Sequence, residues 1–178
     1  MGTIGKHLPV KLFCGITYCQ NVNLNDIYKE LENLFSPIEL ESNKYTFSQF
    51  TDYYSKEMGE NLMKLFLVFT DLQMPEDLPD IKKTTNQLEE NYLVENMRTV
   101  NLDPGYISEA KLVLATTKNY SHRIYLGKGI FGDIHLQFTN GSFQSQSWTY
   151  PDYQQPQIRD FFKKIREQYF EQLGEESY

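Results

Sequence analysis

The segment Val10-Lys-Leu-Phe-Cys-Gly-Ile-Thr-Tyr18 is the first of a series of apolar patterns that together predict the fold class. It is a short run of strand-forming residues that starts directly after Pro9 and ends in a polar turn. From Leu24 to Phe35, apolar residues recur at spacings of three and four, which places them on one helical face. Pro37 ends this helix, because the residue before a proline is pushed away from helical backbone angles. The opening of the chain therefore predicts a strand followed by a helix.

Further strands and a second helix follow. Residues 38–41 alternate apolar and acidic side chains, the pattern of a half-buried strand. Residues 62–69 are almost entirely apolar, which is typical of a central strand covered on both faces. A helical spacing runs from Ile81 to Tyr92, and residues 98–102 predict another short strand. This order predicts a ferredoxin-like split βαβ core (βαββαβ), in which a four-stranded sheet carries both helices on one face.

The last third of the sequence predicts an antiparallel meander. Asn140-Gly141 favours a tight hairpin, because both residues tolerate positive φ angles. A final helix is predicted after Pro156, where apolar residues again share one face. The strands expected in this region are residues 111–117, 122–126, 130–138 and 142–148. We therefore expect one α+β domain over residues 1–178, in which the meander and a C-terminal helix extend the ferredoxin-like core.

The composition is that of a folded, acidic protein. The 178 residues include 17 Lys and Arg against 24 Asp and Glu, and the net charge of −7 disfavours general adhesion to nucleic acid or anionic lipid. The longest apolar run falls far short of the roughly 20 residues that cross a bilayer, and the first residues lack the apolar core of a secretion signal. Cys14 and Cys19 are the only two cysteines, and no nearby His pairs with them as a metal ligand. We therefore expect a cytoplasmic protein with reduced thiols and no membrane partner.

Several motifs resemble those of one known family. They are Thr51-Asp-Tyr-Tyr54, Glu57-Met-Gly59, Asp103-Pro-Gly-Tyr106, Lys111-Leu-Val-Leu-Ala-Thr-Thr-Lys118, His122-Arg-Ile-Tyr-Leu126 and Trp148-Thr-Tyr-Pro-Asp-Tyr153. Through these motifs nearly the whole chain resembles a prokaryotic family catalogued as domain of unknown function 4416. That family has no established activity, so the resemblance implies membership and leaves the function to be read from the residues.

Positive charge gathers in one segment of this acidic chain. Between Arg98 and Gly129 there are five cations and two anions, a net charge of +3, whereas the remaining 12 cations and 22 anions give −10. A cationic region in an acidic protein can attract anionic ligands. The candidate contacts to an anion are Arg98, Lys111, Lys118 and Arg123. The alternative is that these are ordinary solvated side chains on strand edges.

Three residues are candidates for proton transfer. His122 can change charge near neutral pH, although a hydrogen-bonded histidine at the edge of the core explains it equally well. Asp103 lies in a predicted tight turn, where its carboxylate either accepts backbone N–H groups or acts as a general base or Mg²⁺ ligand. Glu57 could pair with Asp103, at a distance that the sequence does not give. The spacing of the three histidines predicts no metal site.

Aromatic residues supply the remaining candidate contacts. Trp148, Tyr150 and Asp152 lie in one segment, whose rings could stack on a base or a sugar or could pack as a loop against the last helix. Tyr54 and Tyr106, which neighbour the candidate acids in the sequence, complete the set. The G-x-G-x-x-G spacing at residues 127–132 is not a dinucleotide fingerprint, because the next residues alternate as a strand and begin no helix.

These residues favour a site for an anionic, phosphorylated small molecule or nucleotide. They leave open whether the protein is an enzyme, which cofactor it uses and whether it forms oligomers. One alternative is an RNA-binding module, against which the net charge and the missing aromatic RNP1 motif argue. Another is a non-catalytic protein-interaction domain that uses the Tyr-rich residues 50–59. The first hypothesis requires that Arg98, Lys118, His122 and Arg123 line one cavity.

Overall fold

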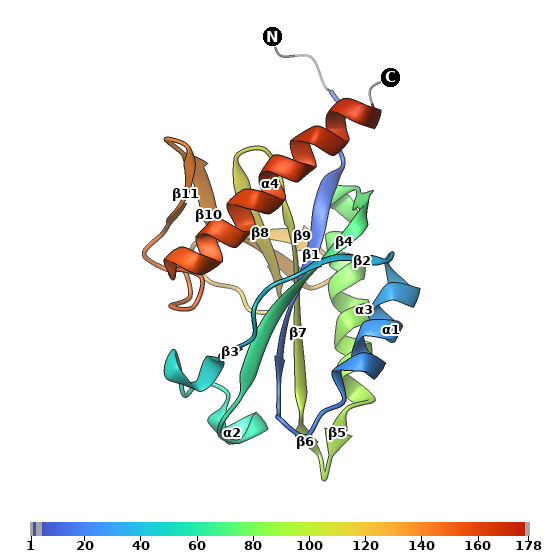
Figure 1. Cartoon of the computed structure of the whole chain (residues 1–178), viewed down its shortest axis with the longest axis vertical. Coiled ribbons are helices and arrows are strands. Elements are labelled where there is room, and N and C mark those ends of the chain that lie inside the picture. The colour runs from blue at the N-terminus through green and yellow to red at the C-terminus, as the bar shows by residue number, and fades with distance from the viewer. Residues whose placement is uncertain (1, 3–4, 177–178) are drawn as a thin grey trace.

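The computed structural model describes residue 2 and residues 5–176, which form a mixed α+β structure with a large antiparallel sheet (Figure 1). Nine strands follow the order β11-β10-β8-β7-β1-β4-β2, with β3 beside β4 and β9 beside β10. They are β1 (Val10–Tyr18), β2 (Ile38–Glu41), β3 (Tyr45–Thr46), β4 (Met63–Gln73), β7 (Val100–Ile107), β8 (Lys111–Thr116), β9 (Arg123–Gly127), β10 (Ile130–Thr139) and β11 (Ser142–Ser145). A separate hairpin joins β5 (Leu93–Val94) to β6 (Met97–Arg98).

Four α-helices lie within the described residues, together with two single-turn 3₁₀ helices. The α-helices are α1 (Leu24–Leu34), α2 (Ser55–Met58), α3 (Leu78–Glu90) and α4 (Pro156–Glu176), and the 3₁₀ turns are Phe47–Gln49 and Pro75–Asp77. None of the helices in this part of the chain is long and apolar enough to cross a membrane.

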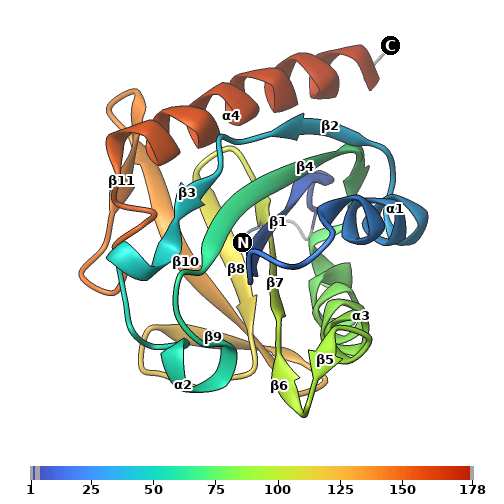
Figure 2. The same ribbon diagram turned by 60° about the horizontal axis from the view of Figure 1, so that its bottom comes forward.

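The sheet separates two layers of helices. α1 and α3 lie together on one side of it, and the long helix α4 crosses the other side (Figure 2). Along β1, Leu12, Cys14 and Ile16 belong to the core beneath α1 and α3, whereas Phe13 packs against Phe162 of α4 with ring centroids 5.0 Å apart. Because both faces of β1 are buried, its sequence is a nearly continuous apolar run rather than an alternating one.

The sheet is larger than the four-stranded core that the sequence predicts. β2, β4, β1 and β7 lie side by side with antiparallel pairing, but β7 also pairs with β8, and the sheet continues through β10 to β11. The α+β class and the C-terminal helix are therefore confirmed. A separate four-stranded ferredoxin-like sheet is not, because the expected meander joins it along the outer edge of β7.

The turn between β10 and β11 confirms the predicted hairpin, and the strand after it is shorter than predicted. Asn140 and Gly141 adopt φ angles of 51° and 77°, the positive values that such a turn requires. β11 ends at Ser145, before the predicted end at Trp148. The cause is a local turn, in which the backbone N–H of Gln146 donates to Oγ1 of Thr149 rather than to a neighbouring strand.

β7 and β8 pair over only part of their length. Residues 105–107 pair with residues 112–114 of β8, whereas β7 pairs with β1 along residues 100–107. Gly105 permits the close approach at the paired end, because a Cβ there would lie 2.4 Å from the carbonyl oxygen of Val113. Before Gly105 the two strands diverge, so the first half of β7 has a strand partner on one side only.

Candidate small-molecule site

A cavity of about 680 Å³ opens where β7 and β8 diverge. This volume falls in the range of roughly 300–1,000 Å³ that is typical of small-molecule sites. One side, here named the α3 wall, consists of Lys82, Glu89, Arg98, Asn101 and Asp103. The opposite side, here named the β8–β9 wall, consists of Thr116, Lys118, Arg123 and Asp133. Residues around α2 and in the turn before α4 also line the cavity, as does Lys64 of β4.

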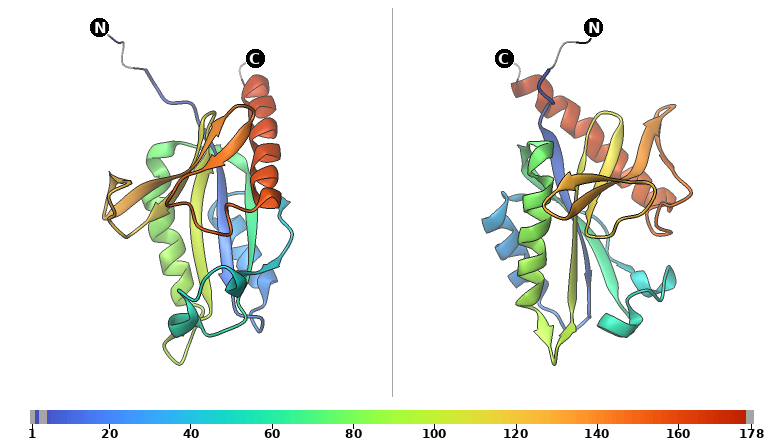
Figure 3. Two further views of the ribbon diagram at one scale, coloured as in Figure 1. Left: turned by 90° about the vertical axis from the view of Figure 1, so that its left-hand side faces the viewer. Right: turned by 180° about the vertical axis from the view of Figure 1, so that it is seen from behind.

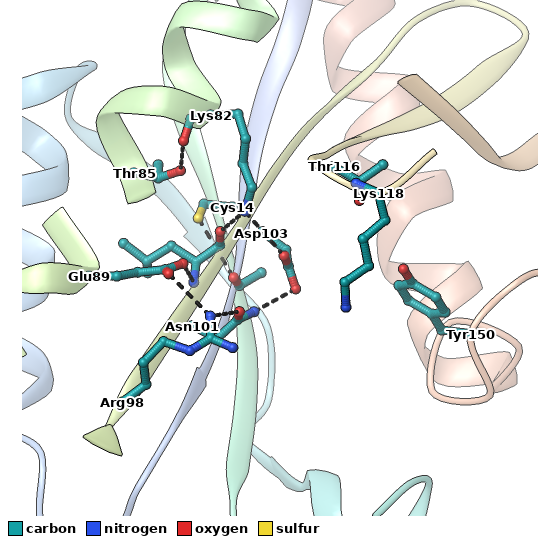
Figure 4. Close-up of polar contacts among 12 residues, drawn as sticks. Cys14, Lys82, Thr85, Glu89, Arg98, Asn101, Asp103, Thr116, Lys118 and Tyr150 are labelled. Carbon is teal, nitrogen blue, oxygen red and sulfur yellow. Dashed lines mark hydrogen bonds and ion pairs between the residues drawn. The ribbon is translucent and has the colours of Figure 1, made fainter. Parts of the chain in front are cut away.

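Two side chains of α3 replace the missing strand partner of β7. The backbone N–H of Leu102 donates to Oε1 of Glu89 at 2.6 Å, and the carbonyl oxygen of Leu102 accepts from Nζ of Lys82 at 2.7 Å (Figure 4). Lys82 and Glu89 are seven residues apart, so they share one helix face across two turns. Both are buried, and the bonds satisfy backbone groups that would be costly to bury without a partner. Their first role is therefore structural.

The rest of the α3 wall is a chain of charged hydrogen bonds. Asp103 accepts from Nζ of Lys82 at 3.4 Å through Oδ1 and from Nδ2 of Asn101 at 2.8 Å through Oδ2. Oδ1 of Asn101 accepts from Arg98 at 3.1 Å, and the same guanidinium forms ion pairs with Glu57 of α2 and with Glu89. The cations of this wall are thus already paired with carboxylates, which leaves them little capacity for an external anion.

The buried carboxylate of Glu89 has a perturbed proton affinity. Burial raises the pKa of Glu89, and the charge of Lys82 and the hydrogen bond from Leu102 oppose this rise. Burial also raises the pKa of Tyr54, whose ring lies 5.9 Å from the guanidinium carbon of Arg98. Burial and contacts within the protein therefore determine the proton affinities of these two groups.

Arg123 anchors the β8–β9 wall. Its Nε donates to Oδ2 of Asp133 at 2.9 Å, and its Nη1 donates to the carbonyl oxygen of Lys118 at 3.0 Å. Its Nη2 donates to the hydroxyl of Tyr150 at 3.1 Å, and the side chain is only 3% exposed. Because each guanidinium nitrogen already has a protein acceptor, Arg123 positions the backbone of Lys118 and the ring of Tyr150 rather than offering an open fork to a ligand.

Lys118 is the exception among the cations of the lining. Its Nζ lies 4.2 Å from the centre of the Tyr53 ring and, within the described residues, has neither a carboxylate nor a hydrogen-bond acceptor in contact. Figure 4 shows the side chain extending between Asp103 and Tyr150 with no dashed contact to either. Partial burial, and after it the charge of Arg123, lower the pKa of Lys118. This ammonium group is therefore available to an anion.

Asp133, in the β8–β9 wall, and His135, behind it, fix the shape of this wall. Asp133 is 1% exposed and contacts His122 and His135 at 3.2 Å each, in addition to Arg123. Nε2 of His135 accepts from the backbone N–H of Tyr150 at 2.9 Å, so the ring carries its proton on Nδ1 and donates to Asp133. Burial lowers the pKa of His135. Burial alone would raise the pKa of Asp133, but the hydrogen bonds from His135 and Arg123 lower it.

A buried ion pair closes the inner end of the cavity. Nζ of Lys64 on β4 lies 2.7 Å from Oδ2 of Asp152, and the hydroxyl of Tyr45 donates to the same oxygen at 2.9 Å. The two charged side chains are 2% and 1% exposed. Their pairing ties β4 to the turn before α4, and breaking either partner would leave an uncompensated buried charge.

The structure brings most of the predicted site residues to this cavity. Those in the lining are Glu57, Asp103, Arg98, Lys118, Arg123, Tyr54, Tyr150 and Asp152. Outside it are His122, Lys111, Tyr106 and Trp148. His122 stacks on Trp148 with ring centroids 4.9 Å apart, and it contacts the lining residues Asp133 and Tyr120. Tyr106 packs in the apolar cluster of Leu78, and Lys111 lies at the far end of β8. Three of the four residues required by the anion hypothesis thus line the cavity.

The sequence analysis missed the residues that organise the walls. Lys82 and Glu89 lie on the face of α3 that carries Leu78 and Leu88, and charged residues among apolar ones on a helix stripe are the signal that could have revealed them. Asp133 and His135 alternate with the apolar residues Ile134 and Leu136 along β10, a pattern typical of a solvent-facing side, although both are buried. α4 and the turn before it cover this region, and no local pattern predicts that contact.

The net positive charge of the segment from Arg98 to Gly129 does not produce a net positive cavity in the folded protein. The cavity lining holds five cations (Lys64, Lys82, Arg98, Lys118 and Arg123) and six anions (Glu57, Glu89, Glu90, Asp103, Asp133 and Asp152). α2, α3 and β10 supply carboxylates that neutralise the segment, and Lys128 pairs with Asp80 of α3. Among the residues that the structure describes, no group of three or more His, Cys, Asp or Glu side chains is arranged to hold a metal ion.

Comparison with protein families gives one match. The family model described as "Domain of unknown function (DUF4416)" matches residues 8–169, which is most of the chain. Comparisons with curated proteins and with solved structures gave no match. The match covers the sheet, α1, α3 and all residues of both cavity walls.

Proposed function

The chain belongs to the family of domains of unknown function described as DUF4416, and we propose that its cavity binds a small molecule carrying an anionic group, such as a phosphorylated metabolite or a nucleotide. The observation that carries the proposal is the state of Lys118. Four of the five cations in the lining are paired with carboxylates, whereas the ammonium group of Lys118 faces the cavity with only an aromatic ring against it. A phosphate or carboxylate would give it the missing partner.

The rest of the cavity suits a ligand with a planar or hydroxylated body. Tyr53, Tyr54 and Tyr150 offer ring faces beside Lys118 and Arg98. The carboxylates of Asp103 and Glu57 accept hydrogen bonds, so they suit hydroxyl or amino groups and would repel a second anionic group. A nucleoside monophosphate or a sugar phosphate has both features. For a reaction on such a ligand, Asp103 is the proton acceptor that we favour, because His122 lies outside the lining.

We also interpret β7, β1, β4 and β2, together with α1 and α3, as a ferredoxin-like unit within the larger sheet. The neighbour order and antiparallel pairing of these strands support this interpretation, as does the apolar cluster that the two helices share on one face. This interpretation bears on the RNA-binding alternative. Sheets of that kind stack bases on aromatic side chains of the open face, whereas here α4 covers that face and Phe13 and Phe66 are 0% exposed. The geometry therefore favours the small-molecule cavity.

The proposal is tested by thermal denaturation and titration calorimetry with a panel of nucleoside monophosphates and hexose phosphates, each beside its unphosphorylated counterpart. We expect at least one phosphorylated compound to raise the Tm by about 5 °C at a 100-fold excess over its Kd. The Lys118→Gln variant should bind that compound at least tenfold more weakly, with a free energy of unfolding within about 0.5 kcal/mol of wild type.

The matched control is Lys111→Gln, which removes a cation of the same segment outside the cavity and should leave the affinity unchanged. The proposal fails if no compound shifts the Tm at millimolar concentration. It also fails if Lys118→Gln binds as tightly as wild type.

A further inference from the structure

The hydroxyl of Tyr150 is a second donor at the cavity, beside the ammonium group of Lys118. Its oxygen accepts from Nη2 of Arg123 at 3.1 Å, and within the described residues its own proton has no acceptor in contact. A phenol oxygen that accepts from a cation still has a proton to donate. Tyr150 lines the cavity, so an acceptor that enters the cavity can take this hydrogen bond.

Contacts within the protein fix the position of this hydroxyl. Arg123 holds the oxygen, and the backbone N–H of Tyr150 donates to Nε2 of His135 at 2.9 Å. The ring packs edge-on against the ring of His135, with centroids 4.4 Å apart. Arg123 and His135 are both bonded to the buried carboxylate of Asp133. The donor is therefore held in place before a ligand arrives, which lowers the entropic cost of binding.

The hydroxyl of Tyr150 is also in the right protonation state to donate. Partial burial, and after it the charge of Asp103, raises the pKa of Tyr150 to about 12, although the charge of Arg123 opposes this rise. Tyr150 is therefore a neutral phenol near neutral pH. A phenolate at this place would repel an anion, whereas a phenol can bond one.

Tyr150 and Lys118 approach each other from different parts of the chain. Lys118 follows β8, and Tyr150 lies in the turn between β11 and α4, which the left view of Figure 3 shows in yellow and in orange-red. Arg123 joins the two, because it also donates to the carbonyl oxygen of Lys118 at 3.0 Å. In Figure 4 the Lys118 side chain extends between Asp103 and Tyr150. The carboxylate of Asp103 repels an anion, so the Tyr150 side of Lys118 suits one better.

We propose that the hydroxyl of Tyr150 and the ammonium group of Lys118 together bind the phosphoryl group of the ligand, each through a different phosphoryl oxygen. This inference rests on the proposed function, and it gives Tyr150 a role in recognising the anionic group that its ring alone does not have. One positive charge and one neutral donor suit a single phosphoryl group. Asp103, on the other side of Lys118, then faces the hydroxyl or amino groups of the ligand body.

Titration calorimetry of the Tyr150→Phe variant tests the proposal. The probes are inorganic phosphate and the nucleoside monophosphates and hexose phosphates of the panel. Tyr150→Phe removes the donor and keeps the ring, so it should bind the phosphorylated compounds at least tenfold more weakly than wild type. The matched control is Tyr125→Phe, whose lost hydroxyl accepts from the backbone N–H of Gly129 outside the lining. This control should bind them as wild type does.

A second measurement separates direct recognition from an effect that Arg123 passes on to Lys118. Without ligand, Lys118 of the Tyr150→Phe variant should react with an acylating reagent at the wild-type rate, as read by mass spectrometry. A changed rate would show that the substitution moves Lys118, and it would overturn direct recognition by Tyr150.

The binding results distinguish this inference from the proposed function. If Lys118→Gln weakens binding and Tyr150→Phe does not, the role of Tyr150 is wrong and the proposed function stands. An equal loss in Tyr125→Phe would also overturn the role of Tyr150. If wild type binds neither inorganic phosphate nor any phosphorylated compound at millimolar concentration, the proposed function fails and this inference fails with it.

Discussion

The two walls of the cavity contain the same kinds of side chain, but they differ in which charges are already paired. On the α3 wall, Lys82 and Glu89 bond the backbone of β7, and Arg98 is held by two carboxylates. On the β8–β9 wall, Arg123 is equally occupied, yet the neighbouring Lys118 is not. A charged lining residue therefore says little about ligand binding until its partners within the protein are known. Whether a charged side chain has a structural or a binding role thus depends on whether it is already paired within the protein, and not on its residue type.

The largest expected effect of a single substitution on stability is at Asp133, which holds the β8–β9 wall together. Asp133→Ala removes the partner of Arg123, His122 and His135 at once and leaves a buried guanidinium uncompensated. We expect a loss of about 3–5 kcal/mol in the free energy of unfolding, measured by urea denaturation. The control is Asp80→Ala, whose ion pair with Lys128 is more than half exposed and should matter by less than about 1 kcal/mol. Equal losses in the two variants would show that Asp133 does not anchor this wall.

On the α3 wall, substitutions of Glu89 can be compared with a substitution of the adjacent Glu90. Glu89→Ala leaves the buried N–H of Leu102 without an acceptor, which should cost about 1–3 kcal/mol of unfolding free energy. Glu89→Gln keeps an acceptor and should lose less. The neighbouring Glu90→Ala changes an exposed carboxylate and serves as the control. If Glu89→Ala unfolds at the same urea concentration as Glu90→Ala, the replacement of a strand partner by α3 is wrong.

The smallest of these effects concerns the pH dependence from His135. Its pKa is lowered below 6.5 in the folded protein, so below pH 6.5 the unfolded chain takes up a proton that the folded chain refuses. Wild type should therefore lose up to about 1.4 kcal/mol per pH unit from this group as the pH falls below 6.5. His135→Gln should show a shallower loss between pH 7 and 5.5, whereas the exposed-residue variant His7→Gln should keep the wild-type slope. Identical slopes in all three proteins would contradict a neutral, buried His135.

Local patterns predicted the elements of this fold well, and they failed where tertiary contacts decide. Apolar spacing was enough to predict β1, α1, β4, α3 and α4, since each buries a continuous face in the core. The continuation of the sheet past β7 depends on three paired residues at Gly105 and was not visible in any one segment. The short helix α2 has four residues and each strand of the β5–β6 hairpin has two, which is too short for a periodic apolar pattern to predict them.

Prediction of the candidate site from the sequence was limited in the same way by contacts between distant segments. The basic residues were predicted from the segment Arg98–Gly129, and Tyr54 and Tyr150 from two other segments of the chain; most of these predicted residues line the cavity. The sequence could not show that Glu57, Glu89 and Asp133 would neutralise Arg98 and Arg123, because these carboxylates reach the cations from other elements. The net charge of a sequence segment predicts the local electrostatic field only where no oppositely charged side chain from a distant segment neutralises it in the fold.

The most direct test of the account is a lysine-acylation footprint read by mass spectrometry, with and without each phosphorylated compound of the panel. Lys118 should react faster than the buried Lys64 and Lys82, since its ammonium group is unpaired and its pKa is lowered. A bound anion should slow the reaction at Lys118 and leave that at Lys111 unchanged. Labelling of Lys118 that stays the same in the presence of every compound would contradict the claim that this residue receives an anionic ligand.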